Sequence, residues 1–344
     1  MPDRRSPGAR PTIYDVADAA GVAISTVSRV LNGSNEVSDA TRDRVREAIE
    51  ALQFQPQRTA RSLAQQSTTS VAVALPSATS MFFVEMLKGV KDALREREID
   101  LLLCNLGSAQ PYRTLQRFLN RGAVDALLLM ALPIEGEVAD QLARFQAPVV
   151  LLGSQYPGLD AFWWDDQQGA QLATSYLAEQ GHRRIGLISA HAWSANAEPR
   201  LNGYRSALDQ AGIEFDSALV VAGETTKHAG YSEEAGAEAM AQLMGLADPP
   251  TAVFAASDVQ AYGAWSYARD HGLVIPRDVS LVGYDDLKLS RFLDLTTVAQ
   301  HMQQAGQQAT ERLLARLDGD GEAGEHVQLG LELVARGSAA PPKP

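Results

Sequence analysis

The 344-residue sequence is poor in cysteine and has no long apolar run. Its single cysteine, Cys104, excludes a disulfide framework within one chain and fits a reducing compartment. The surrounding run LLLCN predicts a buried strand thiol. No apolar run approaches the ~18–20 residues of a membrane helix. The N-terminal MPDRRSPGARP lacks the apolar core of a secretory signal, so we expect residues 1–11 to be a disordered leader and the protein to be cytoplasmic.

Signatures of catalysis are also absent. The six histidines have no metal-binding spacing, and no H-E-x-x-H, CxxC pair, P-loop or G-x-S-x-G elbow occurs. We therefore expect no metal, no cofactor and no enzymatic activity. A sugar-metabolising enzyme stays open as a weaker alternative, which turnover of a bound sugar would support.

The formal charge of −12 is unevenly distributed. Residues 1–66 hold nine Arg, no Lys and eight Asp or Glu, which gives +1; the other 278 residues hold 21 Lys or Arg and 34 acids, which gives −13. Phosphates would repel the acidic part, whereas Arg offers planar paired donors that suit phosphate and guanine. This balance indicates a local reader of nucleic acid rather than a protein that coats it.

Residues 12–33, TIYDVADAAGVAISTVSRVLNG, predict two short helices around a tight turn. Apolar residues recur at helical spacing in both halves, and Gly21 can adopt the positive φ that ends the first helix. Thr12 is the expected N-cap, with Asp15 in a capping-box-like position. A third helix begins at Ser38 and carries the apolar stripe Val45, Ile49 and Leu52. Together these features predict a helix-turn-helix, which lays its second helix in the DNA major groove; an ordinary helical hairpin is the alternative.

Three motifs give this region a family resemblance. TVSRVLNG, the pattern VS-x-x-TR-x-R-V-x-x-A and the segment P-x-x-x-ARSL resemble the LacI/GalR family of bacterial repressors, and the resemblance extends over residues 12–338. It implies a DNA-binding domain at 12–57 and a hinge helix with linker at 58–70 that folds on operator DNA. Leu63 would wedge into the minor groove, and Ala60 would face the partner hinge. A linker with one incidental leucine is the alternative.

The resemblance and the chemistry of the grooves indicate which residues contact DNA. On the second helix, Ile24, Ser25 and Arg29 are expected to face the bases, with Arg29 on guanine and Ile24 on a thymine methyl. Thr12, Tyr14, Asn32 and Thr41 would hold phosphates and set the register. The full predicted DNA-binding set is Thr12, Tyr14, Ile24, Ser25, Thr26, Ser28, Arg29, Asn32, Thr41, Ala60 and Leu63.

From Val71 onward, short β-rich apolar runs alternate with helical segments. The expected strands are VAVALP, DLLLCN, DALLLM, PVVLLG, RIGLIS, ALVVAG, TAVFAAS and VSLVGYDD, with a last strand near 326–334. The expected helices are about 82–97, 111–121, 136–146, 167–180 and 302–317. The alternation predicts two parallel sheets with crossover helices.

The predicted fold class is therefore a small all-α helix-turn-helix domain plus hinge helix, followed by a two-subdomain α/β periplasmic-binding-protein-like effector domain. The resemblance implies three crossing strands between the subdomains, near 162–165, 298–300 and 330–333. Residues 71–338 would bind the effector and dimerise, and residues 339–344 would be a flexible tail. Because the tail carries no leucine heptad, we expect a homodimer rather than a tetramer.

Ligands on open α/β sheets bind beyond the carboxyl ends of the strands. The residues that follow these ends include aromatic, Arg, Asn and Asp side chains, which suit a polyhydroxylated ligand. The predicted effector-binding residues are Phe82, Trp193, Asn196, Arg200, Asp258 and Gln300. The family motifs in PRLNGYRSAL, ASDVQAYGA and DLTTVAQ support Arg200, Asp258 and Gln300. A structural ion pair is the alternative for Arg200 and Asp258, and Asp285 is expected to cap a turn.

These expectations converge on a transcriptional regulator, most simply a repressor, that binds a pseudo-palindromic operator as a homodimer. A small-molecule effector between the two subdomains, a sugar or sugar derivative, would change their closure angle and hence the operator affinity. A corepressor-dependent repressor, for example one that binds a purine, is the alternative. A sugar-binding protein for transport is a further one, but it would need an export signal and no DNA-reading domain.

Overall fold

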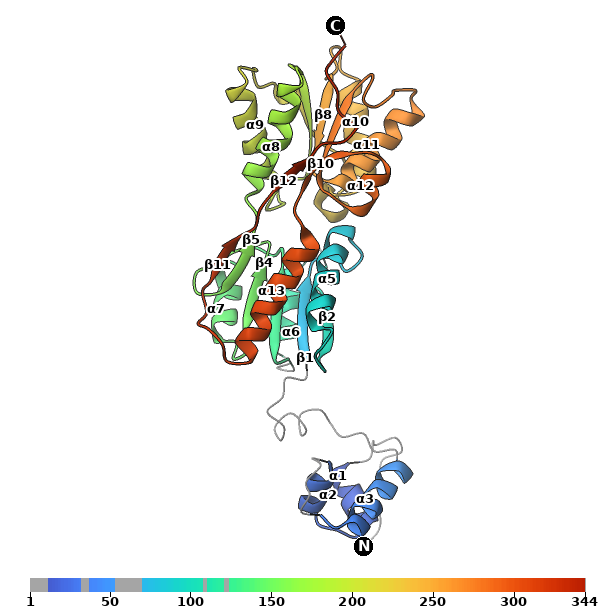
Figure 1. Ribbon diagram of the computed structural model, residues 1–344, viewed down its shortest axis with the longest axis vertical. Helices are drawn as coiled ribbons and strands as arrows, with labels where there is room; N and C mark the ends of the chain where they lie inside the picture. Colours follow the sequence, from blue (N-terminus) through green and yellow to red (C-terminus); the bar gives the residue numbers. More distant parts are fainter. Residues whose placement is uncertain (1–11, 32–36, 53–69, 108–109, 121–123, 344) are drawn as a thin grey trace. The chain divides into compact units, whose positions relative to one another are not determined.

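The computed structural model describes residues 12–31, 37–52, 70–107, 110–120 and 124–343 (Figure 1). The chain divides into two compact units, residues 1–69 and 70–344. The predicted leader and hinge helix, and with them Ala60, Leu63 and the phosphate candidate Asn32, lie outside the described residues.

The N-terminal unit contains three helices: α1 (Ile13–Ala20), α2 (Ile24–Leu31) and α3 (Asp39–Ala51). Thr12 donates its backbone N–H to Asp15 Oδ2 at 2.7 Å and completes the predicted capping box. Gly21 ends α1 with a φ of 63°, a conformation that glycine adopts without a steric penalty. The core is formed by Val16, Ala17, Ala20, Val27, Val45 and Ala48, against which Ile49 and Leu52 pack. The predicted helix-turn-helix and its third helix are confirmed.

The second unit, residues 70–344, is called the effector unit below after its expected role. It begins with an N-subdomain built on a six-stranded sheet in the order β11-β5-β4-β3-β1-β2. All its neighbouring strands are parallel; in register, Val71 of β1 lies beside Leu101 of β2 and Ala126 of β3. The strands are β1 (Ser70–Leu75), β2 (Asp100–Asn105), β3 (Ala126–Met130), β4 (Val149–Leu152), β5 (Asp160–Trp163) and β11 (His326–Gln328). Cys104 is buried on β2, as predicted.

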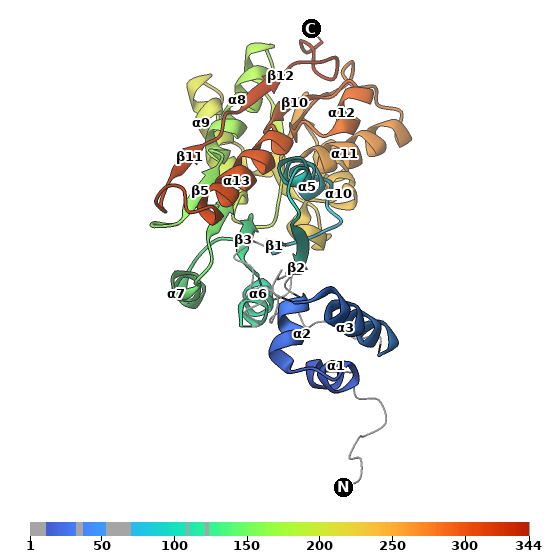
Figure 2. The ribbon, with the colours of Figure 1, turned by 60° about the horizontal axis from the view of Figure 1, so that its bottom comes forward.

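Helices cover both faces of this sheet because alternate side chains of each strand point to opposite sides. Val71, Val73 and Leu75 of β1 share a core with α5 (Met81–Leu94) and α13 (Met302–Leu317). Ala72 and Ala74 face the core formed with α6 (Pro111–Leu119) and α7 (Gly136–Arg144). Figure 2 shows α5 and α13 on one side of the sheet and α6 and α7 on the other.

The C-subdomain repeats this plan with the strand order β12-β10-β9-β8-β6-β7. Its strands are β6 (Ile185–Ser189), β7 (Val220–Ala222), β8 (Ala252–Ala255), β9 (Ser280–Asp285), β10 (Thr296–Ala299) and the antiparallel β12 (Glu332–Val334). Its α-helices are α8 (Asp166–Glu179), α9 (Ala197–Gln210), α10 (Glu233–Met244), α11 (Asp258–Asp270) and the short α12 (Lys288–Phe292); two 3₁₀ turns span Ser217–Leu219 and Lys227–Gly230. The predicted pair of α/β halves is confirmed.

Three chain segments connect the subdomains, from β5 to α8, from β10 to α13 and from β11 to β12. They coincide with the three predicted crossings. The single strand expected over 326–334 was wrong, because the chain changes sheets there: β11 pairs with β5 and β12 pairs with β10. Leu329, between them, donates its N–H to the carbonyl of Trp163 at 2.7 Å.

The expected flexible tail is also corrected for residues 339–343. The Ala340 N–H donates to Ser280 Oγ, and its carbonyl accepts from that hydroxyl, both at 3.0 Å. The Ala340 carbonyl also lies 3.0 Å from Nε2 of the buried His182, and Lys343 pairs with Asp278 at 2.7 Å. These contacts hold the segment on the C-subdomain. Among the helices that the structure describes, none combines the length and apolar character required to span a membrane.

Candidate DNA-binding surface and effector site

The second helix of the helix-turn-helix presents its predicted base-reading residues outward. Ile24 is 41% exposed although it is apolar, and Ser25 and Arg29 are also exposed, whereas Val27 is fully buried. Residues four apart lie on the same face of a helix, so Ser25 and Arg29 share a face, and all three residues project away from the buried Val27. Thr26 and Ser28 are half-buried at its margins.

The predicted phosphate-binding residues lie on other helices of the same unit. Thr12 and Tyr14 are exposed at the start of α1, Tyr14 to 64%. Thr41, on α3, is half-buried and accepts a hydrogen bond from Ser38 Oγ at 2.9 Å. Because an exposed tyrosine at a helix N-terminus is accessible to a phosphate, this geometry fits the expected roles, which stay predictions.

A buried arginine is the centre of the candidate effector site. Arg200, on α9, is 4% exposed, and its Nε and Nη2 lie 2.8 and 2.7 Å from Oδ1 of Asp166. Asn196 donates to the other Asp166 oxygen at 2.9 Å, and Arg200 also donates to the carbonyl of Ala256, just beyond β8. The structure thus brings two predicted residues, Asn196 and Arg200, together on Asp166. Burial by itself would lower the pKa of Arg200, but Asp166 and the surrounding tyrosines outweigh it and raise the pKa.

Arg200 packs on the ring of Tyr284, and Gly169 leaves the space that this ring occupies. The guanidinium carbon of Arg200 lies 3.9 Å from the centroid of the Tyr284 ring, a cation–π contact. A Cβ at Gly169, on α8, would collide with the hydroxyl of Tyr284. Because residue 169 has no side chain, the tyrosine can lie flat under Arg200.

Asp258, predicted to contact the effector, is instead surrounded by donors from the protein itself. This fully buried carboxylate accepts hydrogen bonds from the Leu287 N–H at 2.8 Å, Ser290 Oγ at 2.5 Å and Thr297 Oγ1 at 2.6 Å. Burial raises its pKa to about 6 even though these hydrogen bonds favour the charged form. Asp258 therefore ties α11 to the turn at Leu287, to α12 and to β10.

Asp285, expected to cap a turn, lies at the end of β9 and is 4% exposed. Its carboxylate accepts a hydrogen bond from the backbone of Asp258, and burial and the Asp258 charge raise its pKa well above the usual range, against the effect of Arg200. Its φ of 129° is rare for a residue with a side chain. Such strain is typical of functional positions.

The remaining part of the site lies where the chain crosses between subdomains. Phe82 makes an edge contact with Trp164, with ring centroids 6.3 Å apart. Trp164 donates its indole N–H to the carbonyl of Gln300 at 2.9 Å. Phe82 and Gln300, predicted from separate segments, therefore both meet Trp164. Trp193 instead stacks on His191 at 4.2 Å and is 66% exposed.

Comparison with known proteins is consistent with both units. Residues 12–57 match the family model of bacterial regulatory proteins of the lacI family, and residues 174–339 match a periplasmic binding protein-like domain. The repressor PurR of Vibrio atlanticus (strain LGP32) is 32% identical over 94% of this chain and 97% of its own length. The chain belongs to the LacI family.

Two solved structures of LacI-family proteins extend this likeness to the fold. The regulator CelR in complex with cellobiose has a TM-score of 0.69 and 32% identity over 96% of this chain and 100% of its own. The lac repressor dimer bound to operator and the anti-inducer ONPF has a TM-score of 0.76 and 26% identity over the same shares. This LacI-family chain is a DNA-binding transcriptional regulator with a small-molecule effector domain.

Sequence reasoning missed three residues that surround Arg200 in this LacI-family chain: Asp166, Gly169 and Tyr284. One signal for Asp166 was available, since Asp166 directly follows the crossing predicted at 162–165. Tyr284 precedes Asp285 inside an apolar strand, where it resembles ordinary core. Gly169 gave no signal, because its role exists only once α8 and β9 are packed together.

Proposed function

We propose that this protein is a repressor whose operator affinity is set by a neutral polyhydroxylated effector, a sugar or sugar derivative. The observation that carries the proposal is the buried Arg200–Asp166 pair with Asn196 beside it. Paired charges of this kind donate to and accept from adjacent hydroxyl groups.

The charge balance around Arg200 supports a neutral ligand. One cation, Arg200, faces Asp166, and Asp285 contributes to its electrostatics as well. Because the cation already has carboxylate partners, an anionic ligand would have to displace one of them at the cost of burying an unpaired charge. A hydroxylated ring can instead pack on Phe82 and bond to the polar groups.

We assign the contacts to the effector to Phe82, Asn196, Arg200, Gln300 and Asp285, the last in place of Asp258. Asp258 is surrounded by its three donors and completely buried, so it positions the strand ends rather than meeting the ligand. Asp166 orients Arg200. Trp193, exposed in the loop that precedes Asn196, is proposed as a rim residue.

Operator binding by the N-terminal unit and effector binding between the subdomains would be coupled through the three crossing segments. An effector that contacts both subdomains favours one closure angle, and linkage requires that operator and effector change each other's affinity by the same factor. Induction by a sugar is the polarity that we propose. A corepressor such as a purine is the second candidate, because neutral heterocycles can also pair with the Asn196 and Gln300 amides.

We further propose that the regulator acts as a homodimer through the side of the effector unit that carries β2, α5 and α12, which Figure 1 shows along one side. β2 is an edge strand, and exposed edges with apolar side chains favour pairing with another chain. Exposed apolar residues on these elements are Met81, Val84, Leu101, Leu103, Leu289 and Phe292. In sedimentation, Leu103→Asp with Phe292→Asp should give monomers. Val274→Asp, at an exposed valine after α11, should not, and a stable wild-type tetramer would contradict the dimer.

The function is tested with the full-length protein and operator DNA that it selects from a random duplex pool. Operator affinity is titrated against a panel of sugars and nucleobases. Weaker binding with a sugar supports induction, and tighter binding with a base supports the corepressor alternative. If none changed the affinity, the switch would be wrong. A chain that begins at residue 67 should protect no operator DNA in a footprinting experiment.

We propose no catalytic activity and a cytoplasmic location, where bacterial operators are found.

A further inference from the structure

The end of β9 has a backbone conformation that its own sequence does not favour. Asp285 and Asp286, two consecutive residues with side chains, have φ angles of 129° and 53°. A positive φ is uncommon outside glycine, and 129° lies beyond the left-handed region that aspartate visits. Such a conformation persists only when surrounding contacts impose it. Because Asp285 is a proposed effector contact, the contacts that hold this turn also decide where its carboxylate lies.

Arg336 binds this turn through its guanidinium group. Its Nη2 lies 2.5 Å from Oδ1 of Asp286, and its Nη1 donates to the carbonyl of Leu295 at 2.6 Å. Two bonds to Thr296 Oγ1 fix the Arg336 backbone, whose N–H donates at 2.8 Å and whose carbonyl accepts at 3.0 Å. Only 13% of the arginine side chain and 14% of the Asp286 side chain are exposed, so water screens this ion pair little.

A second arginine near Asp286 provides an internal comparison. Nη2 of Arg291, on α12, lies 4.0 Å from Asp286 Oδ2, and 73% of the Arg291 side chain is exposed. Exposed ion pairs contribute little to stability. Both arginines bring the same charge to one carboxylate, but the guanidinium of Arg336 is much the more buried and also bonds to Leu295. We therefore attribute the restraint on Asp286 to Arg336.

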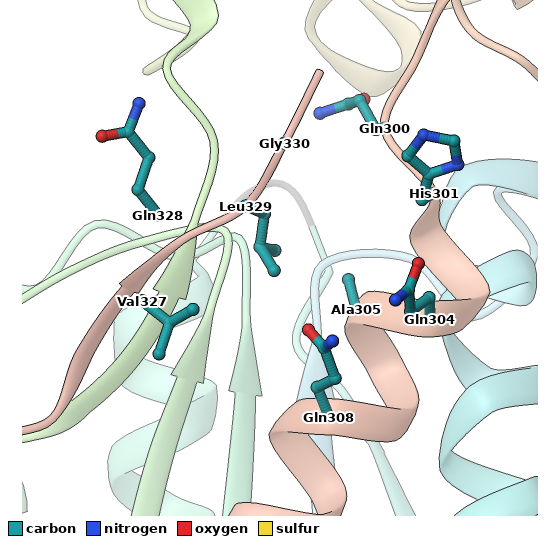
Figure 3. Close-up of a pocket in the computed structure, with 9 residues that line it drawn as sticks. All are labelled: Gln300, His301, Gln304, Ala305, Gln308, Val327, Gln328, Leu329 and Gly330. Atoms are coloured by element: carbon teal, nitrogen blue, oxygen red, sulfur yellow. The ribbon is translucent and has the colours of Figure 1, made fainter. Parts of the chain in front are cut away.

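Arg336 lies close to where the third crossing enters the C-subdomain. This crossing runs from β11 through Leu329 and Gly330 into β12, and Arg336 follows two residues after β12 ends. Figure 3 shows it across a pocket of about 210 Å³ from the second crossing at Gln300 and His301. The two crossings continue as neighbours in the C-subdomain sheet, because β12 pairs with β10. Arg336 therefore connects the end of β9 to a strand that leads directly from a crossing.

We propose that Arg336 is a positioning residue for the effector, which couples the third crossing to Asp285. Its bond to Asp286 imposes the positive φ angles of the turn and so directs the Asp285 carboxylate towards Arg200, with whose charge it interacts. A change in closure angle that moves the third crossing would then also move Asp285. This inference rests on the proposed function, in which Asp285 contacts the effector.

The restraint itself is tested without any effector. Hydrogen exchange of the full-length protein is measured by mass spectrometry on peptides that cover residues 281–290. In this segment the N–H groups of Asp286 and Leu287 are both bonded to side chains. Arg336→Ala should speed their exchange by about tenfold or more, because the turn opens more often. Arg291→Ala, the matched control, should leave the exchange as in the wild type.

The consequence for the effector is measured by calorimetry, with cellobiose and ribose as the first probes and otherwise the panel compound to which the wild type responds. Arg336→Ala should bind the probe about tenfold more weakly, and Arg291→Ala as tightly as the wild type. Glycine adopts a positive φ without a partner, so Arg336→Ala combined with Asp286→Gly should regain affinity to within about threefold of the wild type.

Arg336→Lys provides a milder variant should Arg336→Ala fold poorly. Its ammonium group can bond to Asp286 but cannot hold the Leu295 carbonyl in the same geometry. We expect a melting temperature close to that of the wild type and a loss of probe affinity smaller than in Arg336→Ala.

Three outcomes would overturn the proposal: unchanged exchange in Arg336→Ala, equal loss of probe affinity in Arg291→Ala and Arg336→Ala, or a lower melting temperature in Arg336→Ala with wild-type probe affinity. The last result would make Arg336 a structural residue only. If no panel compound binds the wild type, the proposed function fails, whereas the exchange measurement still decides whether Arg336 restrains the turn. The two failures are therefore distinguishable.

Discussion

The two units of this regulator place their functional side chains in opposite environments. In the N-terminal unit, the proposed DNA contacts Tyr14, Ile24 and Arg29 project from a small core. In the effector unit, Arg200 and Asp285 are buried among other polar groups. A substitution among the proposed DNA contacts should change operator binding alone. A substitution of Arg200 or Asp285 should change both effector binding and the stability of the fold, because the same contacts serve both.

The largest effect is expected for Arg200→Ala. It leaves Asp166 without its partner, and breaking a buried ion pair costs about 3–5 kcal/mol, so both thermal stability and the effector response should fall. Lysine should not restore the response, because its single ammonium group cannot contact Asp166 Oδ1 through two nitrogens and also donate to the Ala256 carbonyl. Arg205→Ala is the control on the same helix, since Arg205 is exposed over the Phe215 ring. A normal response in Arg200→Ala would contradict the assignment.

Gly169→Ala should have the next largest effect, although it adds only a methyl group. The new Cβ collides with the Tyr284 hydroxyl, and such overpacking costs about 1–3 kcal/mol. Because Tyr284 supports Arg200, effector affinity should fall with the melting temperature. Gly330→Ala, where a Cβ meets no atom within 4 Å, is the comparison. Equal effects of the two substitutions would show that space at residue 169 is not what matters.

Arg29→Ala should change the function of the DNA-binding unit and leave the effector unit unaffected. It should weaken operator binding by about 1–3 kcal/mol and relax the preference at one base position. Thermal stability and effector affinity should not change, since Arg29 is exposed on α2. Anisotropy titrations against a set of operator variants measure this. An unchanged base preference would exclude Arg29 as a reader.

The smallest effect concerns pH. The pKa of Asp258 is raised from 3.8 to about 6 by burial, so between these values the folded chain binds a proton more tightly than the unfolded chain. The resulting stabilisation is complete below pH 4 and is lost as the pH rises through 6. Relative to Asp258→Asn, the wild-type free energy of unfolding should therefore decline by about 1–3 kcal/mol from pH 4 to 7. A constant difference across that range would contradict the raised pKa.

The same contrast explains what the sequence could predict. The helix-turn-helix could be predicted because its sequence signals are local: a cap at Thr12, a turn glycine at Gly21 and the helical spacing of apolar residues. The sheets followed from strand alternation, and the three crossings from the family resemblance. Position after a strand suggested Arg200 and Asn196 as effector contacts, and a motif also suggested Arg200; the structure brings both side chains together on Asp166, and their contact with an effector stays a prediction. Tyr284 and Gly169 were not identified, because their roles arise only when segments more than 100 residues apart pack together.

Asp258 illustrates a second limit. A motif marks a position as important, but it does not say whether the side chain meets a ligand or holds the backbone. Only the three donors at Leu287, Ser290 and Thr297 distinguish the two roles. The sequence likewise did not predict that the chain passes from one sheet to the other between β11 and β12, because the whole segment is extended and its two ends pair in different sheets.

The docking of the last residues on the C-subdomain has a practical consequence for protein engineering. Ser338 is fully buried, bridging the Thr296 N–H and the Leu281 carbonyl, and the Ala340 backbone satisfies Ser280. A chain that ends at Ser338 would lose the Ala340 contacts to Ser280 and to the imidazole of the buried His182. Expression versions should therefore retain everything through Lys343, and affinity tags belong beyond that lysine.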